Sequence, residues 1–247
     1  MKNKIKILPE NVANKIAAGE VVNRPESVVK ELLENSIDAD AKNIDVIIKN
    51  AGKTLIQVVD DGTGMSEEDA VLCVQRHATS KIASVEDLES ITTFGFRGEA
   101  LASIAAVSQF ELKTRRKEDE LGTIIKIEND GQIIVEKDSF QVGTSVSVKN
   151  LFYNVPARRN FLKSNATELK HILDAFKRAA LSHPEISFKF YNDDDLIFDF
   201  AASSIYDRMK NVFAENIIDA VLEVKEITDY ISLTGFITKP AYLQKSK

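Results

Sequence analysis

The sequence predicts an α/β protein, because strand-like runs and amphipathic helical segments both recur along its 247 residues. Residues 43–49 and 54–60 are rich in Val and Ile and flank a short turn, which is the pattern of a β-hairpin. Four further strands are expected between residues 108 and 150. Apolar side chains recur at helical spacing in 25–38 and 167–182, so both segments are predicted to be helices that bury one face.

The helix predicted at residues 25–38 is the element around which the rest of the chain is organised. Pro25 suits the first position of a helix, and an apolar stripe follows, made of Val28, Val29, Leu32, Leu33 and Ile37. Glu31, Asn35 and Asp38 stack along one edge of that stripe at spacings i, i+4 and i+7. These polar groups are placed where a pocket could open, although alone they are more typical of an ordinary helix surface.

The remaining elements follow in chain order and are bounded by turn and capping signals. Helices are expected at 9–19, 66–75, 84–90, within 93–107 and 151–162, and at 203–213. Strands are expected at 108–115, 122–129, 132–137, 144–150, 186–191, 195–200, 220–226 and 230–238. Ser66 with Asp69 resembles a capping box. A boundary near residue 202 divides the chain into 1–202 and 203–247.

Composition and charge exclude several classes of protein. The chain is 44% hydrophobic and 28% charged, and no apolar run approaches the roughly 18 residues of a membrane span. Its single cysteine, Cys73, is expected in the core. One cysteine excludes a disulfide framework, and this fits a cytoplasmic location. The net charge of −6 argues against binding nucleic acid through bulk electrostatics. The three histidines show no metal-ligand spacing.

The first motif with possible chemistry is Asp60-Asp61-Gly62-Thr63-Gly64, where a predicted strand meets a helix. Its two glycines allow backbone to approach a flat ligand closely. An acidic residue at the strand end can accept hydrogen bonds from such a ligand. An ordinary strand-to-helix turn would explain this motif equally well.

A second motif, residues 95–101 (G-F-R-G-E-A-L), places two glycines directly before a predicted helix. Exposed backbone N–H groups and the helix dipole make this position suitable for a phosphate. The hydroxyl and ammonium groups of Thr79, Ser80 and Lys81 could serve the same anion, although alone they are more typical of a capping loop. The P-loop pattern is absent from the chain, so a nucleotide would be held in another way.

Together these motifs resemble the nucleotide-binding motifs of the GHKL ATPases, which include gyrase B, the Hsp90 chaperones, the sensor histidine kinases and the MutL proteins. The motifs that carry the resemblance are E-L-L-E-N-S-I-D-A from Glu31, D-D-G-T-G-M from Asp60, G-F-R-G-E-A-L-A-S-I from Gly95 and V-G-T-S-V at 142–146. Three more stretches resemble the MutL branch, which acts in DNA mismatch repair: I-A-A-G-E-V-V-N-R-P at 16–25, R-H-A-T-S-K-I at 76–82 and L-F-Y-N-V-P-A-R-R-N-F-L at 151–162. The resemblance extends from Ile7 to about Lys239.

The resemblance implies a role for individual residues in binding and hydrolysing ATP with Mg²⁺. Glu31 matches the general base that activates the attacking water, and Asn35 matches the Mg²⁺ ligand. Asp60 matches the carboxylate that accepts the adenine amino group, with support from Thr144. Gly64 is expected beneath the base.

A lid over the phosphates is implied by the same resemblance. Its members would be Gly95, Phe96, Arg97 and Gly98, together with Thr79, Ser80 and Lys81. Asp61 departs from the asparagine most familiar at that position of the motif and adds a negative charge.

The implied fold is a two-layer α+β sandwich, a mixed β-sheet with helices on one face known as the Bergerat fold. This ATP-binding domain would occupy residues 1–202, and residues 203–247 would begin a second α/β domain. In the MutL branch that second domain supplies a lysine to the γ-phosphate, and a carboxy-terminal domain mediates dimerisation. The chain is therefore expected to be a piece of a longer protein, with weak ATPase activity of its own.

Implied partners are a second copy in an ATP-dependent homodimer, mismatch-recognition proteins and downstream repair proteins, with DNA as a secondary ligand and no membrane. The leading hypothesis is a slow ATPase whose nucleotide state controls dimerisation. A nucleotide-gated scaffold with incidental hydrolysis is the first alternative, and the presence of Glu31 argues against it. A DNA-binding module using Arg115-Arg116-Lys117, Arg158-Arg159 and Lys163 is the second. A gyrase B-like or Hsp90-like ATPase is the third. The stretches at 76–82 and 151–162, which resemble the MutL branch, argue against it.

Overall fold

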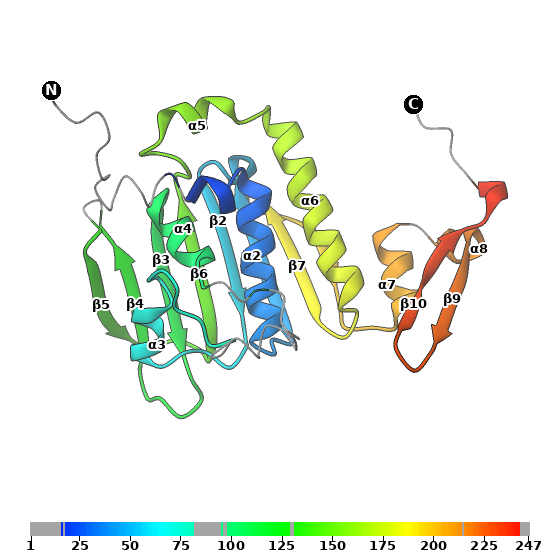
Figure 1. Ribbon diagram of the computed structural model, residues 1–247, viewed down its shortest axis with the longest axis horizontal. Helices are drawn as coiled ribbons and strands as arrows, with labels where there is room; N and C mark the ends of the chain where they lie inside the picture. The colour runs from blue at the N-terminus through cyan, green and yellow to red at the C-terminus, as the bar shows by residue number, and fades with distance from the viewer. Residues whose placement is uncertain are drawn as a thin grey trace, which may run out of the picture.

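The structure, a computed structural model, describes residues 16, 18–81, 95, 98–128, 131–213 and 215–242. Its centre is an eight-stranded mixed sheet in the order β5-β4-β3-β6-β2-β1-β7-β8, and a separate two-stranded sheet pairs β9 with β10. Helices α2, α4 and α6 lie over one face of the large sheet (Figure 1). The predicted two-layer α/β arrangement is confirmed.

The bounds of the elements are as follows. The strands are β1 (Asn43–Lys49), β2 (Leu55–Asp60), β3 (Gln109–Arg115), β4 (Gly122–Ile127), β5 (Ile133–Asp138), β6 (Gly143–Lys149), β7 (Ser187–Asn192), β8 (Asp195–Phe200), β9 (Val221–Ile227) and β10 (Ser232–Thr238). The helices are α2 (Pro25–Asp38), α3 (Glu67–Leu72), α4 (Ala100–Ala106), α5 (Pro156–Phe161), α6 (Asn165–Ser182), α7 (Ile205–Val212) and α8 (Ile217–Ala220).

The core lies between the sheet and the helices that cover it. Alternate residues of β1 (Ile44, Val46 and Ile48) are fully buried, as expected for a strand with one covered face. The apolar stripe of α2 is buried against this layer, with both Leu32 and Leu33 at most 2% exposed. The strands pair antiparallel except β1 with β7, which run parallel. This packing fixes α2 over the middle of the sheet.

Most predicted elements are confirmed within the described residues, with shifts at their ends. The helix expected to reach Gln75 ends at Leu72, because the chain tightens so that the amide of Gln75 donates to the carbonyl of Leu72. The helix expected from Thr167 begins at Asn165, because Ser164 is the cap that accepts from the Thr167 amide. Predicted helix 84–90 and most of 9–19 lie outside the described residues.

Among the residues that the structure describes, no helix is both long enough and apolar enough to cross a bilayer.

Helix α7 is fixed to the large sheet by Arg208, whose side chain is fully buried. Its Nη1 atom donates to the carbonyl of Ala180 at 2.6 Å. Its Nη2 atom lies within 3.1 Å of three more carbonyls, those of Pro184, Ile186 and Ala201. One guanidinium therefore satisfies carbonyls at the end of α6, before β7 and after β8.

We predict that Arg208→Met lowers the free energy of unfolding by about 3 kcal/mol or more, because several buried carbonyls lose a charged donor at once. Urea unfolding followed by circular dichroism measures this change. The matched control is Lys210→Met, on the same helix but only partly buried and paired with the exposed Asp207, which should alter stability by about 0.5 kcal/mol at most. Equal effects of the two substitutions would contradict the assigned role of Arg208.

Candidate functional site

The carboxylate of Asp60, at the end of β2, is held by donors from three different elements. Ser36 of α2 donates its hydroxyl to Oδ2 at 2.8 Å. The backbone amides of Gly62 and Thr144 donate to Oδ1 at 3.0 Å and 3.2 Å. Burial raises the pKa of Asp60, and the three hydrogen bonds oppose that rise by stabilising the charged form. The group is thus a fixed acceptor at the edge of the core.

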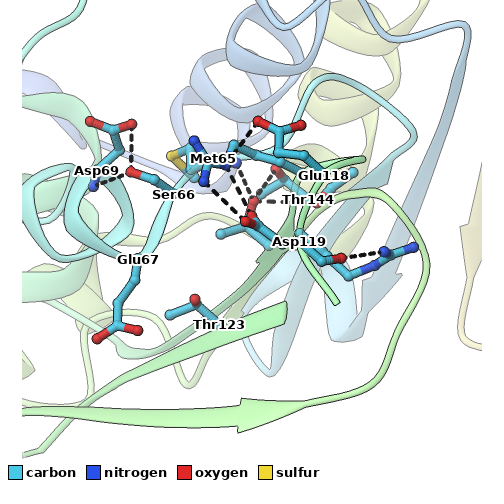
Figure 2. A network of polar contacts seen from close by, with 12 residues as sticks. Met65, Ser66, Glu67, Asp69, Glu118, Asp119, Thr123 and Thr144 are labelled. Carbon is cyan, nitrogen blue, oxygen red and sulfur yellow. Dashed lines mark hydrogen bonds and ion pairs between the residues drawn. The ribbon is translucent and has the colours of Figure 1, made fainter. Parts of the chain in front are cut away.

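A threonine pair extends this arrangement towards β3. The hydroxyls of Thr114 and Thr144 lie 3.1 Å apart across neighbouring strands. The Thr114 oxygen also accepts the backbone amide of Met65 at 2.9 Å, and Figure 2 shows Met65 and Thr144 meeting at this point. Thr114 is fully buried. The loop after β2 is therefore tied to the two strands beside it.

The loop between β2 and α3 requires glycine at residue 64. Gly64 has a φ of 69°, and a Cβ atom there would lie 2.2 Å from the carbonyl oxygen of Arg115. Any other residue would force the loop away from β3. The loop then enters α3 through Ser66, whose oxygen accepts the amide of Asp69 at 3.0 Å (Figure 2), confirming the predicted capping signal.

Asp61 points its carboxylate to the start of β1. It accepts the backbone amides of Lys42 and Asn43 at 2.7 Å and 2.8 Å, and the side-chain amide of Asn43 at 2.7 Å. Desolvation acts against the charge, but these hydrogen bonds prevail and hold the pKa of Asp61 below its ordinary value. The extra charge relative to asparagine is therefore used to cap a strand.

The polar edge of α2 carries the second part of the site. Lys81 reaches this edge, where its Nζ atom donates to Asp38 Oδ2 at 2.5 Å and to Asn35 Oδ1 at 3.4 Å. Glu31 lies one turn before Asn35, and its side chain is 26% exposed. Burial raises the pKa of Glu31, partly opposed by the nearby Lys30. The carboxylate of Glu31, the amide of Asn35 and the ammonium group of Lys81 therefore all lie along this edge of α2.

Two segments that were predicted to serve phosphates lie side by side. Gly98 has a φ of 61°, and a Cβ atom there would lie 2.4 Å from the carbonyl oxygen of Ala78. Next to this contact, His77 Nδ1 lies 3.3 Å from Glu99 Oε1. A Cβ atom on Gly95 would lie 3.6 Å from Lys81 Nζ. The structure therefore brings 77–81 and the base of α4 together.

The predicted site residues fall into two connected groups. Asp60, Gly64 and Thr144 form one group, and Asn35 with Lys81 belongs to the other; Ser36, next to Asn35, joins them through its bond to Asp60. Thr79 accepts the amide of Lys81 at 3.1 Å, while Ser80 is exposed. Phe96 and Arg97 lie outside the described residues.

Three residues of this site were not identified from the sequence: Ser36, Thr114 and Asp38 in its contact with Lys81. One signal was available for Thr114. It stands at a core-facing position of a strand after Phe110 and Leu112, where a polar residue needs a hydrogen-bond partner. Ser36 and Asp38 carry no such signal, since polar residues at the margin of an amphipathic helix are ordinarily expected to face water.

Known proteins similar to this chain belong to one family. Residues 23–149 match the family of histidine kinase-, DNA gyrase B- and HSP90-like ATPases. DNA mismatch repair protein MutL from Chlorobium phaeobacteroides is 54% identical over 242 residues, which are 97% of this chain and 38% of that protein. Its namesake from Christiangramia forsetii is 52% identical over 249 residues, covering 100% of this chain and 40% of that protein. The chain thus spans about two-fifths of the length of these relatives.

Solved structures agree with this relationship. The Aquifex aeolicus MutL ATPase domain complexed with ADP is 32% identical with a TM-score of 0.69, over 92% of this chain and 80% of that chain. The N-terminal domain of a DNA repair protein is 25% identical with a TM-score of 0.78, over 93% of this chain and 72% of that chain. The chain therefore belongs to the histidine kinase-, DNA gyrase B- and HSP90-like ATPases, and within them to the MutL family.

Proposed function

We propose that this chain binds ATP and hydrolyses it slowly, as part of a longer DNA mismatch repair protein whose nucleotide state controls dimerisation. The observation that carries this proposal is the position of Asp60, held by Ser36, Gly62 and Thr144 beside the polar edge of α2. A base-binding acceptor and a phosphate-binding edge are thereby connected through one helix. The ADP-bound relative from Aquifex aeolicus supports a nucleotide as the ligand.

The base-binding end fits an adenine. Each carboxylate oxygen can accept two hydrogen bonds, and among the described residues Asp60 Oδ2 accepts one, from Ser36. We propose that Oδ2 accepts the amino group of adenine and that Thr144 supports Asp60 through its amide. Because Gly64 has no side chain, the loop can lie directly against the backbone of Arg115. We propose that this leaves room for the base to lie on the loop.

The phosphate-binding end fits a magnesium nucleotide. Among the described residues no group of three or more His, Cys, Asp or Glu side chains could hold a metal alone, and Mg²⁺ commonly relies on few protein ligands plus phosphate oxygens and water. Asn35 Oδ1 would be the protein ligand. When bound, the ion neutralises charge on the phosphate oxygens. Lys81, Thr79 and Ser80 would donate to the phosphates, with Gly95, Phe96, Arg97 and Gly98.

Glu31 is proposed as the general base. Its carboxylate lies one helical turn from Asn35, and its raised pKa makes it a better proton acceptor than a free glutamate. Accepting the proton of the attacking water is the step that this residue would perform. A scaffold with incidental hydrolysis would have no need for a carboxylate in this environment.

DNA, repair proteins and a second copy of the chain are proposed as partners of the longer protein, in the cytoplasm. Two arginines that could have contacted DNA instead make contacts within the chain. Arg115 donates to the carbonyls of Phe140 and Asp119, and Arg116 pairs with the carboxylate of Asp119. We therefore assign any DNA contact made by this chain to other basic residues, such as Arg159 and Lys163.

The division into residues 1–202 and 203–247 stays a prediction. Arg208 joins α7 to the large sheet, and Val212 at the end of α7 belongs to the main core. These contacts favour a domain boundary after α7 instead of before it.

We predict that ATP binds about 10³-fold more tightly than GTP, because guanine would place a carbonyl oxygen against the Asp60 carboxylate. Asp60→Asn should weaken ATP binding and reduce the preference to about tenfold, since the amide can donate to that carbonyl. Calorimetric titration with both nucleotides measures this. The control is Asp61→Asn, whose carboxylate serves β1 and should leave the preference intact. Equal binding of ATP and GTP by the parent chain would place Asp60 away from the base.

We predict that Glu31→Ala binds Mg-ATP within a few-fold of the parent but loses roughly 10²-fold in turnover, the scale of a positioned general base. Asn35→Ala should lose both binding and turnover, because the metal is held before and during the reaction. Phosphate release and calorimetry on the same preparations separate the two effects. Glu34→Ala, on the same helix but paired with Lys30, is the control. Full turnover by Glu31→Ala would instead favour the scaffold hypothesis.

A further inference from the structure

Lys81, one of the residues assigned to the phosphates, is held by α2. Its ammonium donates to Asp38 Oδ2 at 2.5 Å and to Asn35 Oδ1 at 3.4 Å. The two charged side chains are only 19% and 11% exposed, so water and salt screen this pair less than a surface ion pair. The contact therefore competes with any anion that requires the same ammonium.

The second acceptor of Lys81 is the oxygen that the proposed function gives to Mg²⁺. Asn35 and Asp38 lie one turn apart on the same line of α2, and the ammonium contacts both. Resting on the proposed function, we infer that Lys81 and Mg²⁺ exchange places. Without nucleotide the ammonium neutralises this corner of α2, and Asp38 is the positioning residue that keeps it away from the phosphates.

Lys81 can make this exchange without a change in the backbone. Its loop is fixed by the bond from its own amide to Thr79 and by the contact of Ala78 with Gly98. The ammonium ends a flexible four-carbon stem and already lies beside Gly95, where a Cβ atom would be 3.6 Å away. A rotation of the side chain would carry it from α2 to the glycine-rich segment.

The exchange keeps a positive charge beside Asp38. The single positive charge of Lys81 leaves Asp38 and meets the phosphates, and the incoming divalent ion compensates the carboxylate left behind. Without Mg²⁺, however, the phosphates must compete with Asp38 for the ammonium of Lys81. The dependence of nucleotide affinity on Mg²⁺ should therefore respond to Asp38 and Lys81 in opposite directions.

The test measures ADP affinity by calorimetry in excess Mg²⁺ and in EDTA, and takes the ratio of the two. Asp38→Asn should raise the affinity in EDTA about tenfold, the scale of a hydrogen bond between charged groups, and so lower the ratio. Lys81→Met should raise the ratio, because the phosphates then lose the ammonium and depend more strongly on the metal. Glu34→Gln is the matched control: it removes a carboxylate that pairs with Lys30 on the same helix and should keep the parent ratio.

An Asp38→Asn ratio equal to that of Glu34→Gln would overturn the exchange, as would equal weakening of both affinities, which indicates a structural role for Asp38. If Asp38→Asn does not fold by circular dichroism, Lys81→Met decides alone, and an unchanged or lower ratio overturns the inference. A parent chain that binds no ADP in either buffer would refute the proposed function and the exchange with it. Binding by the parent with unchanged ratios in the variants would remove the exchange alone.

Discussion

The hydrogen bond between Ser36 and Asp60 is the interaction on which the rest of the site depends. It joins α2 to the end of β2 at 2.8 Å, and the opposite oxygen of Asp60 binds the start of β6 through Thr144. Helix, loop and two strands are thus fixed around one carboxylate. Asn35 directly precedes Ser36 on α2. The same bond therefore also sets the distance between the base-binding end and the phosphate-binding end of the site.

The fold supplies the conditions for this bond. Burial of the apolar stripe of α2 against β1 and β2 sets the rotation of the helix about its own axis. That rotation directs Ser36 towards the sheet and leaves Glu31, Asn35 and Asp38 along its margin. Burial also raises the pKa values of both Asp60 and Glu31, so the packing that stabilises the helix also tunes the two carboxylates that the proposed mechanism uses.

Much of the fold could be predicted from local sequence, because its signals are local. Strand β1 was predicted with its observed bounds, and the Ser66 cap of α3 is as expected. The parallel pairing of β1 with β7 has no such signal, since the partners are more than a hundred residues apart. The buried position of Arg208 was also not predicted, because four carbonyls gather around it only after α6, β7 and β8 have packed.

The candidate site divides in the same way. Glu31, Asn35, Asp60 and Gly64 stand in motifs whose residue order is informative, whereas the contact of Lys81 with Asp38 spans 43 residues. Only the folded loop brings that ammonium to α2. The destination of the Asp61 charge likewise required the structure, since the amides that bind it lie 18 and 19 residues earlier in the chain.

The central claim is that Asp60, oriented by Ser36, binds the adenine amino group. A crystal structure of this chain with ADP tests it most directly. We expect Asp60 Oδ2 within about 3 Å of the adenine amino nitrogen, the distance of an N–H···O hydrogen bond, while the Ser36 hydroxyl still donates to the same oxygen. An adenine bound elsewhere, or an Asp60 carboxylate turned away from the base with its bond to Ser36 broken, would contradict the account.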